Sequence, residues 1–319
     1  MGKESLVRSK AALTRRQALA RTLFGSGPIR SQMIFVWICV PPIVLYFAAF
    51  YLYPVISAIS LSLHRWSFMI PEHPFIGLDN YRWVLQDRVF WIALKNTLYF
   101  SVFYVILSIG IGLALGVLIY RFKEPFKSVM QTVCFIPVMT SMVVTAQVWE
   151  LLYMPGYGIL NYFLGFFGLG PFLWTASPTQ VMPSIIAMSV WKAVGYYMVL
   201  FIAGLTAIPR YLYEAAWIDG ASRWQTFWKV TLPLLVPTVL FSLVTGSIGA
   251  FQVFTQVWVM TDPPGGPGKS SYVLLLQVFD RGFRFYEMGK ASAIAFILFV
   301  IVMAVTLVQN ALLQEGFEY

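Results

Sequence analysis

The sequence predicts an all-α, polytopic membrane protein with six transmembrane helices and a helix-turn-helix on the cytoplasmic side. Hydrophobic residues make up 59% of the 319-residue chain, charged residues make up only 11%, and the mean hydropathy is +0.74. This composition excludes a soluble globular domain. A helix needs about 20 mostly apolar residues to cross a bilayer. Suitable segments lie near 33–63, 90–120, 128–153, 181–208, 234–260 and 291–313.

The distribution of Lys and Arg predicts the orientation of these segments. In a six-span topology, the N-terminal tail and the loops around 121–127 and 210–229 face the same side, and together they are richer in basic residues than the opposite loops. Loops rich in Lys and Arg stay in the cytoplasm. We therefore expect both termini to be cytoplasmic, together with the polar segment near 210–233.

Much of the net charge of +9 lies in a basic N-terminal tail, residues 1–32, which precedes a membrane domain at 33–319. A basic segment beside a membrane span binds anionic lipid head groups. This location favours membrane lipid over nucleic acid as the partner of the tail. Arg15-Arg16 could belong to a twin-arginine signal, but no small-residue cleavage site precedes the first span, so we expect a retained cytoplasmic extension.

No residues in a pattern typical of catalysis or metal binding occur in the chain. Cys39 and Cys134 both lie in apolar runs, where a cysteine is usually a small core residue. His64 and His73 lie close to an outer interface, without a matching nucleophile or acid. The stretch 265–271 imitates a phosphate-binding loop, but its glycine spacing is wrong and no β-strand precedes it. We therefore expect no catalytic residue, metal site or cofactor in this chain.

A polar helix-turn-helix lies between the fourth and fifth apolar segments. Residues 212–219 can form two turns of helix, in which the small side chains of Ala215 and Ala216 allow another backbone to approach closely. Gly220 then ends the helix, because it adopts backbone angles that other residues avoid.

The second helix of this pair is predicted from Ser222 to Val230. It carries Trp224, Phe227 and Trp228 on one face, and Pro233 marks the entry into the next span. A short amphipathic pair with small, apolar and charged residues suits docking into the groove of a partner protein.

The polar segment closely resembles the Glu-Ala-Ala (EAA) loop of the integral membrane permeases of ABC importers. The match covers Glu214-Ala215-Ala216, Asp219-Gly220-Ala221, Phe227 and Leu232-Pro233, whereas the triplet alone would fit an ordinary surface helix. The resemblance implies that the chain contacts an ATPase through a coupling helix made by six residues: Glu214, Ala215, Ala216, Asp219, Gly220 and Ala221.

The resemblance extends from about residue 33 to residue 313 and indicates the carbohydrate-importer branch, of maltose and glycerol-phosphate type. Matching stretches are Gly77–Tyr81, Asn96-Thr97, Tyr157–Asn161 and Gly265–Pro267. The chain departs from the family pattern at Pro263-Pro264, which appear as an insertion in an outer loop.

The family implies a mechanism in which this chain is a transport subunit and not an enzyme. Two homologous permeases form the pathway in the bacterial inner membrane, and an external solute-binding protein delivers the sugar. A dimer of ABC ATPase subunits binds ATP and Mg and hydrolyses the ATP. Closure of the ATPases would rock the spans around a site in the middle of the membrane.

Polar side chains within the spans are candidates for the substrate pathway, because such groups are costly in a bilayer. The fourth span offers Ser189, Lys192 and Tyr196, and the fifth offers Gln252 and Gln256. Aromatic faces beside amides and hydroxyls suit a sugar. In maltose-type members of the family, the corresponding parts of these spans line the sugar site.

Lys192 leaves two interpretations open. It either forms a structural contact, by snorkelling or by an ion pair with Glu150, or it binds an anionic group of the substrate. The second case would favour an acidic saccharide or a phosphorylated polyol over a neutral oligosaccharide.

An autonomous ion-coupled secondary transporter is the alternative function. Such a carrier needs inward-facing charges in several spans and usually has inverted repeats. The sequence contains neither feature.

Overall fold

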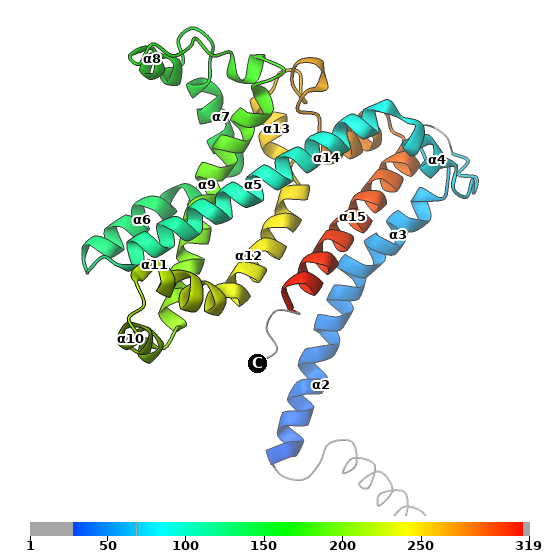
Figure 1. Cartoon of the computed structure of the whole chain (residues 1–319). Coiled ribbons are helices and arrows are strands. Elements are labelled where there is room, and N and C mark those ends of the chain that lie inside the picture. The colour runs from blue at the N-terminus through cyan, green and yellow to red at the C-terminus, as the bar shows by residue number, and fades with distance from the viewer. Residues whose placement is uncertain (1–27, 68, 70, 315–319) are drawn as a thin grey trace, which may run out of the picture. The chain divides into compact units, whose positions relative to one another are not determined.

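The computed structural model describes residues 28–67, 69 and 71–314, and within these ranges it contains helices and loops but no β-strand (Figure 1). The chain divides into two compact units, Met1–Ser60 and Leu61–Tyr319. Most of the predicted tail, residues 1–32, lies outside the described residues. The all-α class is confirmed for the part that the structure describes.

The first unit is a run of helix that continues into the start of the second unit. It consists of α2 (Pro28–Phe47), a π-helical turn (Ala48–Leu52) and α3 (Tyr53–Ser62). Residues Phe35–Ser62 are long and apolar enough to cross a membrane. This stretch corresponds to the first predicted span, 33–63.

The second unit contains the remaining spans, and three of them match the sequence prediction closely. These are α5 (Arg88–Tyr120), α9 (Val181–Ala207) and α15 (Met288–Gln314). Shorter helices join or cap them: α4 (Asp79–Gln86), α8 (Ile159–Gly165), α10 (Arg210–Ile218), α11 (Arg223–Thr226), α13 (Thr255–Met260) and α14 (Leu274–Phe279).

The third predicted span, 128–153, is not a continuous helix. It consists of α6 (Phe126–Met139) and α7 (Met142–Leu152), which are bent by 97° across their junction. The described residues therefore contain five spans by length and composition, or six when this bent pair is counted as one. Thr140 and Ser141 at the junction have extended backbone angles, which interrupt the helical hydrogen bonds.

The fifth span also differs from the prediction, at both ends. It ends at Phe251, and a break at 252–254 separates it from α13, so the predicted range 234–260 is wrong beyond 251. At its start, α11, a π-helical turn (Phe227–Thr231) and α12 (Leu232–Phe251) form one continuous helix. Pro233 is the second residue of α12, at the start of the apolar run as predicted, but the π turn joins α12 to α11 without an intervening loop. A wider π turn accommodates the missing N–H and the bulk of the proline ring.

The helix α9 lies at the centre of the second unit and packs against α5, α6, α12 and α13. Its contact with α5 is close because Gly112 and Gly116 face it. A Cβ atom at Gly112 would lie 2.5 Å from the Cβ of Tyr197, and one at Gly116 would lie 3.1 Å from the Cβ of Phe201. Small residues permit such close helix packing in membranes, where lipid gives little hydrophobic drive for association.

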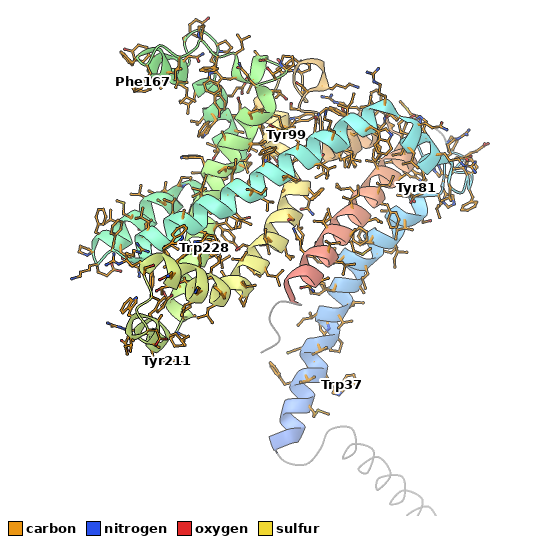
Figure 2. The ribbon with its side chains drawn as sticks, viewed as in Figure 1. Trp37, Tyr81, Tyr99, Phe167, Tyr211 and Trp228 are labelled. Carbon is orange, nitrogen blue, oxygen red and sulfur yellow. The ribbon has the colours of Figure 1, made fainter. Side chains whose placement is uncertain are left out.

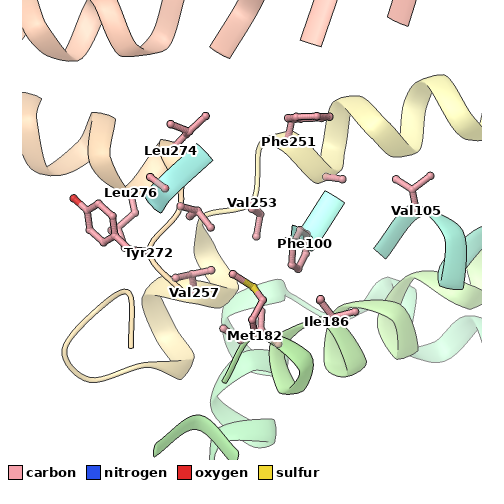
Figure 3. Close-up of a cluster of buried hydrophobic side chains, with 14 of the residues drawn as sticks. Phe100, Val105, Met182, Ile186, Phe251, Val253, Val257, Tyr272, Leu274 and Leu276 are labelled. Carbon is pink, nitrogen blue, oxygen red and sulfur yellow. The ribbon is translucent and has the colours of Figure 1, made fainter. Parts of the chain in front are cut away.

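One apolar core joins these helices to the segments that follow α12. Side chains from α5, α9, α12, α13 and α14 are buried together (Figure 3). Their members include Phe100, Met182, Phe251, Val257 and Leu274. The core therefore holds the short helices after the break at 252–254 against the long spans.

A polar network fastens one end of the second unit. Asp87 caps the N-terminus of α5 by accepting a hydrogen bond from the Val89 N–H at 3.0 Å. Its carboxylate also accepts a hydrogen bond from the Gln277 side chain at 3.0 Å and lies 3.6 Å from the Arg281 guanidinium. Arg281 pairs in turn with Glu287 at 3.0 Å, just before α15. The network thus connects the start of α5 with α14 and α15.

Candidate functional site

The helix α10 ends in a turn that glycine makes possible. Gly220 has φ +77°, a left-handed conformation that favours glycine. The Ala221 N–H donates to the Ala216 carbonyl at 2.9 Å, and the Gly220 N–H donates to the Trp217 carbonyl at 3.1 Å. These two hydrogen bonds form a Schellman motif. The structure thus gives Gly220 the turn geometry that the sequence predicts.

The next helix begins with a capping box. The hydroxyl of Ser222 accepts a hydrogen bond from the Gln225 N–H at 3.3 Å, and the Gln225 side-chain oxygen accepts one from the Ser222 N–H at 2.8 Å. The pattern Ser-x-x-Gln signals such a cap in a sequence, although the predicted helix-turn-helix did not include it. The turn between α10 and α11 is therefore fixed from both sides.

The surface of this helix-turn-helix combines charges with large apolar side chains. Ile218 is 86% exposed, and Trp217 and Trp224 are also exposed; Tyr211 and Trp228 are labelled in Figure 2. Glu214, Ala215, Asp219 and Gly220 are exposed, whereas Ala216 and Ala221 are half-buried. The ion pair between Arg210 and Glu214, at 3.2 Å, is exposed and contributes little stability by itself. Exposed apolar side chains with interspersed charges are typical of a protein docking surface.

The bend in the third span contains the second candidate site. The Lys192 ammonium, on α9, donates hydrogen bonds to the carbonyls of Pro137 at 2.8 Å and Thr140 at 2.5 Å. The Val138 carbonyl and the Thr140 hydroxyl are further acceptors, at 3.3 Å and 3.2 Å. Carbonyls at the C-terminal end of a helix lack partners in their own helix and carry partial negative charge. Lys192 therefore supplies the hydrogen-bond donors for the carbonyls that the bend between α6 and α7 leaves free.

A glycine brings α9 close enough for this contact. Gly195 lies one turn beyond Lys192, and a Cβ atom there would collide with the backbone carbonyl of Cys134 on α6. The two helices therefore approach backbone to backbone beside the bend.

The proposed ion pair between Lys192 and Glu150 is wrong. Within the described ranges, the ion pairs do not join these residues, and Glu150 is exposed. Backbone carbonyls of the broken helix accept the hydrogen bonds of Lys192 in place of that carboxylate. Of the two interpretations, the geometry supports a structural contact.

The other pathway candidates lie in two different environments. Ser189 is buried and donates a hydrogen bond to the Ile185 carbonyl of its own helix at 2.7 Å, and Gln256 is buried on α13. Tyr196 is 41% exposed on α9, and Gln252 is exposed at the C-terminal end of α12. The structure therefore does not gather the five predicted residues into one cavity, and only Tyr196 and Gln252 among them are accessible to a ligand.

A groove of about 700 Å³ lies between α5, α6 and α9, but its chemistry does not suit a sugar. Its walls are almost entirely apolar and include Phe103, Pro137, Trp191 and Tyr99, the last of which is labelled in Figure 2. Sugar hydroxyls need hydrogen-bond partners, and few polar atoms face this groove.

The chain is similar to transport proteins along most of its length. Residues 106–315 match the family described as binding-protein-dependent transport system inner membrane component. The trehalose/maltose transport system permease protein MalF of Thermococcus litoralis is 36% identical over 272 residues, which cover 85% of this chain and 91% of that relative. The lactose transport system permease protein LacF of Rhizobium radiobacter is 32% identical, with 86% and 92% covered.

A solved structure of a bacterial ABC transporter involved in the import of alginate has the same fold. Its chain superposes with a TM-score of 0.79 at 23% identity, covering 90% of this chain and 98% of that chain.

Replacing Lys192 with Met is expected to destabilise the protein. The change removes the donor that the Pro137 and Thr140 carbonyls use, and a buried polar group without a partner costs about 1–3 kcal/mol. The thermal unfolding midpoint in detergent should fall. Glu150→Gln is the control, which should leave the midpoint unchanged and should not rescue Lys192→Met. An unchanged midpoint for Lys192→Met would contradict the structural role.

Proposed function

The chain belongs to the family of binding-protein-dependent transport system inner membrane components, and on this premise we propose that it is the permease subunit of an ATP-driven importer for a sugar. The family predicted from the sequence is confirmed, since the match covers most of the chain and relatives exceed 30% identity. In this proposal the chain forms half of the translocation pathway, with a second, homologous permease as the other half.

The continuous helix from Arg223 to Phe251 is the observation that carries the coupling mechanism. It joins the docking segment to the fifth span without an intervening loop, so a movement of α10 and α11 is transmitted to the pathway as a rigid-body movement. The partner that moves the segment is an ABC ATPase dimer, which binds ATP and Mg. Its docking surface is made or bordered by the six predicted coupling residues: Glu214, Ala215, Ala216, Asp219, Gly220 and Ala221.

The orientation follows from the position of this docking segment. An ATPase works in the cytoplasm, so α10 lies on the cytoplasmic side, as does the N-terminus. The loop around Lys269 then faces the outside, where a solute-binding protein delivers the substrate. The excess of Lys and Arg on the inner side supports this assignment.

Relatives support a sugar or a related polyol as the substrate. Besides the two permeases already described, they include an arabinooligosaccharides transport system permease of Bacillus subtilis and an sn-glycerol-3-phosphate transport system permease of Agrobacterium fabrum. Lys192 does not argue for an anionic cargo, because backbone oxygens already surround its ammonium group. We therefore favour a neutral oligosaccharide, with Tyr196 and Gln252 as its contacts in this chain.

Substitutions in the docking segment are expected to uncouple transport without preventing membrane insertion. Gly220→Val places a β-branched residue at φ +77°, which costs about 1–2 kcal/mol, and Glu214→Lys reverses an exposed charge. Both variants should lose the ATPase on purification and should lose sugar uptake in proteoliposomes. Lys123→Gln, an exposed change in a different loop that is predicted to lie on the same side, is the control. Normal uptake with the ATPase retained would show that this surface is not the coupling site.

Cysteine labelling tests the orientation. In a chain that lacks Cys39 and Cys134, an impermeant thiol reagent should label Lys269→Cys in intact cells, but should label Arg223→Cys only after the membrane is opened. The reverse pattern would place the docking segment outside and would exclude the coupling mechanism.

Loss of the Tyr196 ring should weaken sugar transport specifically. Tyr196→Ala is expected to raise the substrate concentration for half-maximal uptake about tenfold, equivalent to about 1.4 kcal/mol. Tyr99 is the matched control, because it is 42% exposed on the apolar groove. Equal uptake defects for Tyr196→Ala and Tyr99→Ala would remove the argument for a sugar contact at Tyr196.

A further inference from the structure

The loop that joins α7 to α9 has a composition unlike that of a water-exposed loop. Between Glu150 and Lys192 the sequence contains no Asp, Glu, Lys, Arg or His. This uncharged stretch includes the whole connection, with α8 and the short helix Trp174–Ala176. Loops in contact with water normally carry charged residues, which keep them hydrated.

The same loop exposes a dense group of large apolar and aromatic side chains. Tyr157 is 84% exposed and Phe167, labelled in Figure 2, is 80% exposed. More than half of the surface is also exposed for Ile159, Tyr162, Phe163, Phe166, Leu169 and Leu173. Contiguous apolar surface of this kind marks a site of contact with a protein or a membrane.

Two polar side chains of the loop, Asn161 and Gln180, are half-buried and hold it together through internal hydrogen bonds. The Asn161 amide donates to the Phe172 carbonyl at 2.9 Å, and its oxygen accepts hydrogen bonds from the Phe172 N–H at 3.1 Å and the Trp174 indole at 2.9 Å. The Gln180 side-chain oxygen accepts hydrogen bonds from the backbone N–H groups of Leu173 and Trp174, at 3.0 Å and 2.8 Å. Polar groups inside and apolar groups outside are the reverse of the arrangement in a soluble loop.

Contacts at the base of the loop fix it to the spans. Tyr153, at the end of α7, donates a hydrogen bond to the Ser184 carbonyl on α9 at 3.0 Å. Its ring stacks on Trp174, with the ring centroids 4.8 Å apart. The aromatic face is therefore held in a defined position at the ends of α7 and α9.

We propose that the aromatic face of residues 157–169 rests in the lipid headgroup region of the membrane and anchors the bent third span. When the bent pair α6–α7 is counted as one span, α7 and α9 are the ends of consecutive spans, and the loop that connects them begins and ends at the membrane surface. Tyr, Trp and Phe are favoured at this boundary, and apolar side chains of interfacial segments insert beside the head groups. The proposal does not depend on the sugar that the protein carries.

The charge pattern favours lipid over a protein that binds and leaves. A transient protein interface has a polar, solvated rim and must stay soluble when the partner is absent. This loop offers no charged rim, and its apolar face would meet water whenever the partner dissociated. The helix-turn-helix at α10 and α11 shows the contrast, because charged residues border its exposed apolar side chains.

Spin labels at two positions test the proposal in the full chain in phospholipid nanodiscs. In a background with Cys39→Ser and Cys134→Ala, nitroxides are attached to Phe163→Cys and Phe167→Cys. We expect the ratio of relaxation by oxygen, which concentrates in lipid, to relaxation by a water-soluble nickel chelate to be several-fold higher at both labels than at a control site in water. The control is Asp262→Cys, an exposed charged position in another loop, where the chelate should dominate.

Two outcomes of the spin-label experiment would overturn the proposal. Relaxation of both loop labels by the chelate as strong as at the control site would place the aromatic face in water. If the labels became protected from the chelate only after a solute-binding protein was added, that protein, and not lipid, would cover the face. Photocrosslinking of the unsubstituted chain to lipid provides a second test, which does not depend on correct folding of the cysteine variants. Lipids with a diazirine near the glycerol backbone should crosslink to the peptide 157–169; absence of this adduct, with the spans still labelled, would also contradict the proposal.

Discussion

The backbone carbonyls of Pro137, Val138 and Thr140 end a helix within the third span, and the Lys192 ammonium binds them. In hydrocarbon, a backbone polar group has no water to bind, so a bent span persists only where another part of the protein supplies the missing partners. One cation satisfies several carbonyls here, which a neutral side chain could not do as well. The bend, in turn, requires α9 to lie against α6, and Gly195 allows that approach.

The rest of the second unit is arranged around α9. Glycines of α5 bring that helix against the opposite side of α9, and the apolar core beyond it includes residues of α12, α13 and α14. The short helices α13 and α7 also pack together, so the helices that follow the breaks in the third and fifth spans are neighbours in the fold. Interrupted spans in membrane transporters occur where backbone is buried in protein or lines a pathway.

Two exposed apolar surfaces of this unit differ in their charged residues, which suggests different environments for them. The surface of α10 and α11 mixes Trp and Ile with Glu, Asp and Arg, and it continues through an unbroken helix into the fifth span. Such a surface can bind a water-soluble partner and transmit its movement. The loop around α8 has no charged residue, and its polar side chains are used internally. It fits a permanent apolar environment that needs no movement to be transmitted.

The sequence by itself determined the fold class, the family and the positions of most spans, because these depend on local composition and on short motifs. The length of an apolar run predicts a span, and a glycine such as Gly220, directly after a short helical segment, predicts a turn. The bend at Thr140, the end of the fifth helix at Phe251 and the partners of Lys192 could not be predicted in this way. Each depends on atoms from distant parts of the chain: the acceptors of Lys192 lie more than fifty residues away from it. Tertiary structure alone decided that this lysine binds a broken backbone and not Glu150. The packing of α9 against α6 determines which acceptors lie within reach of the ammonium group, and neither the type nor the spacing of the residues reveals that packing.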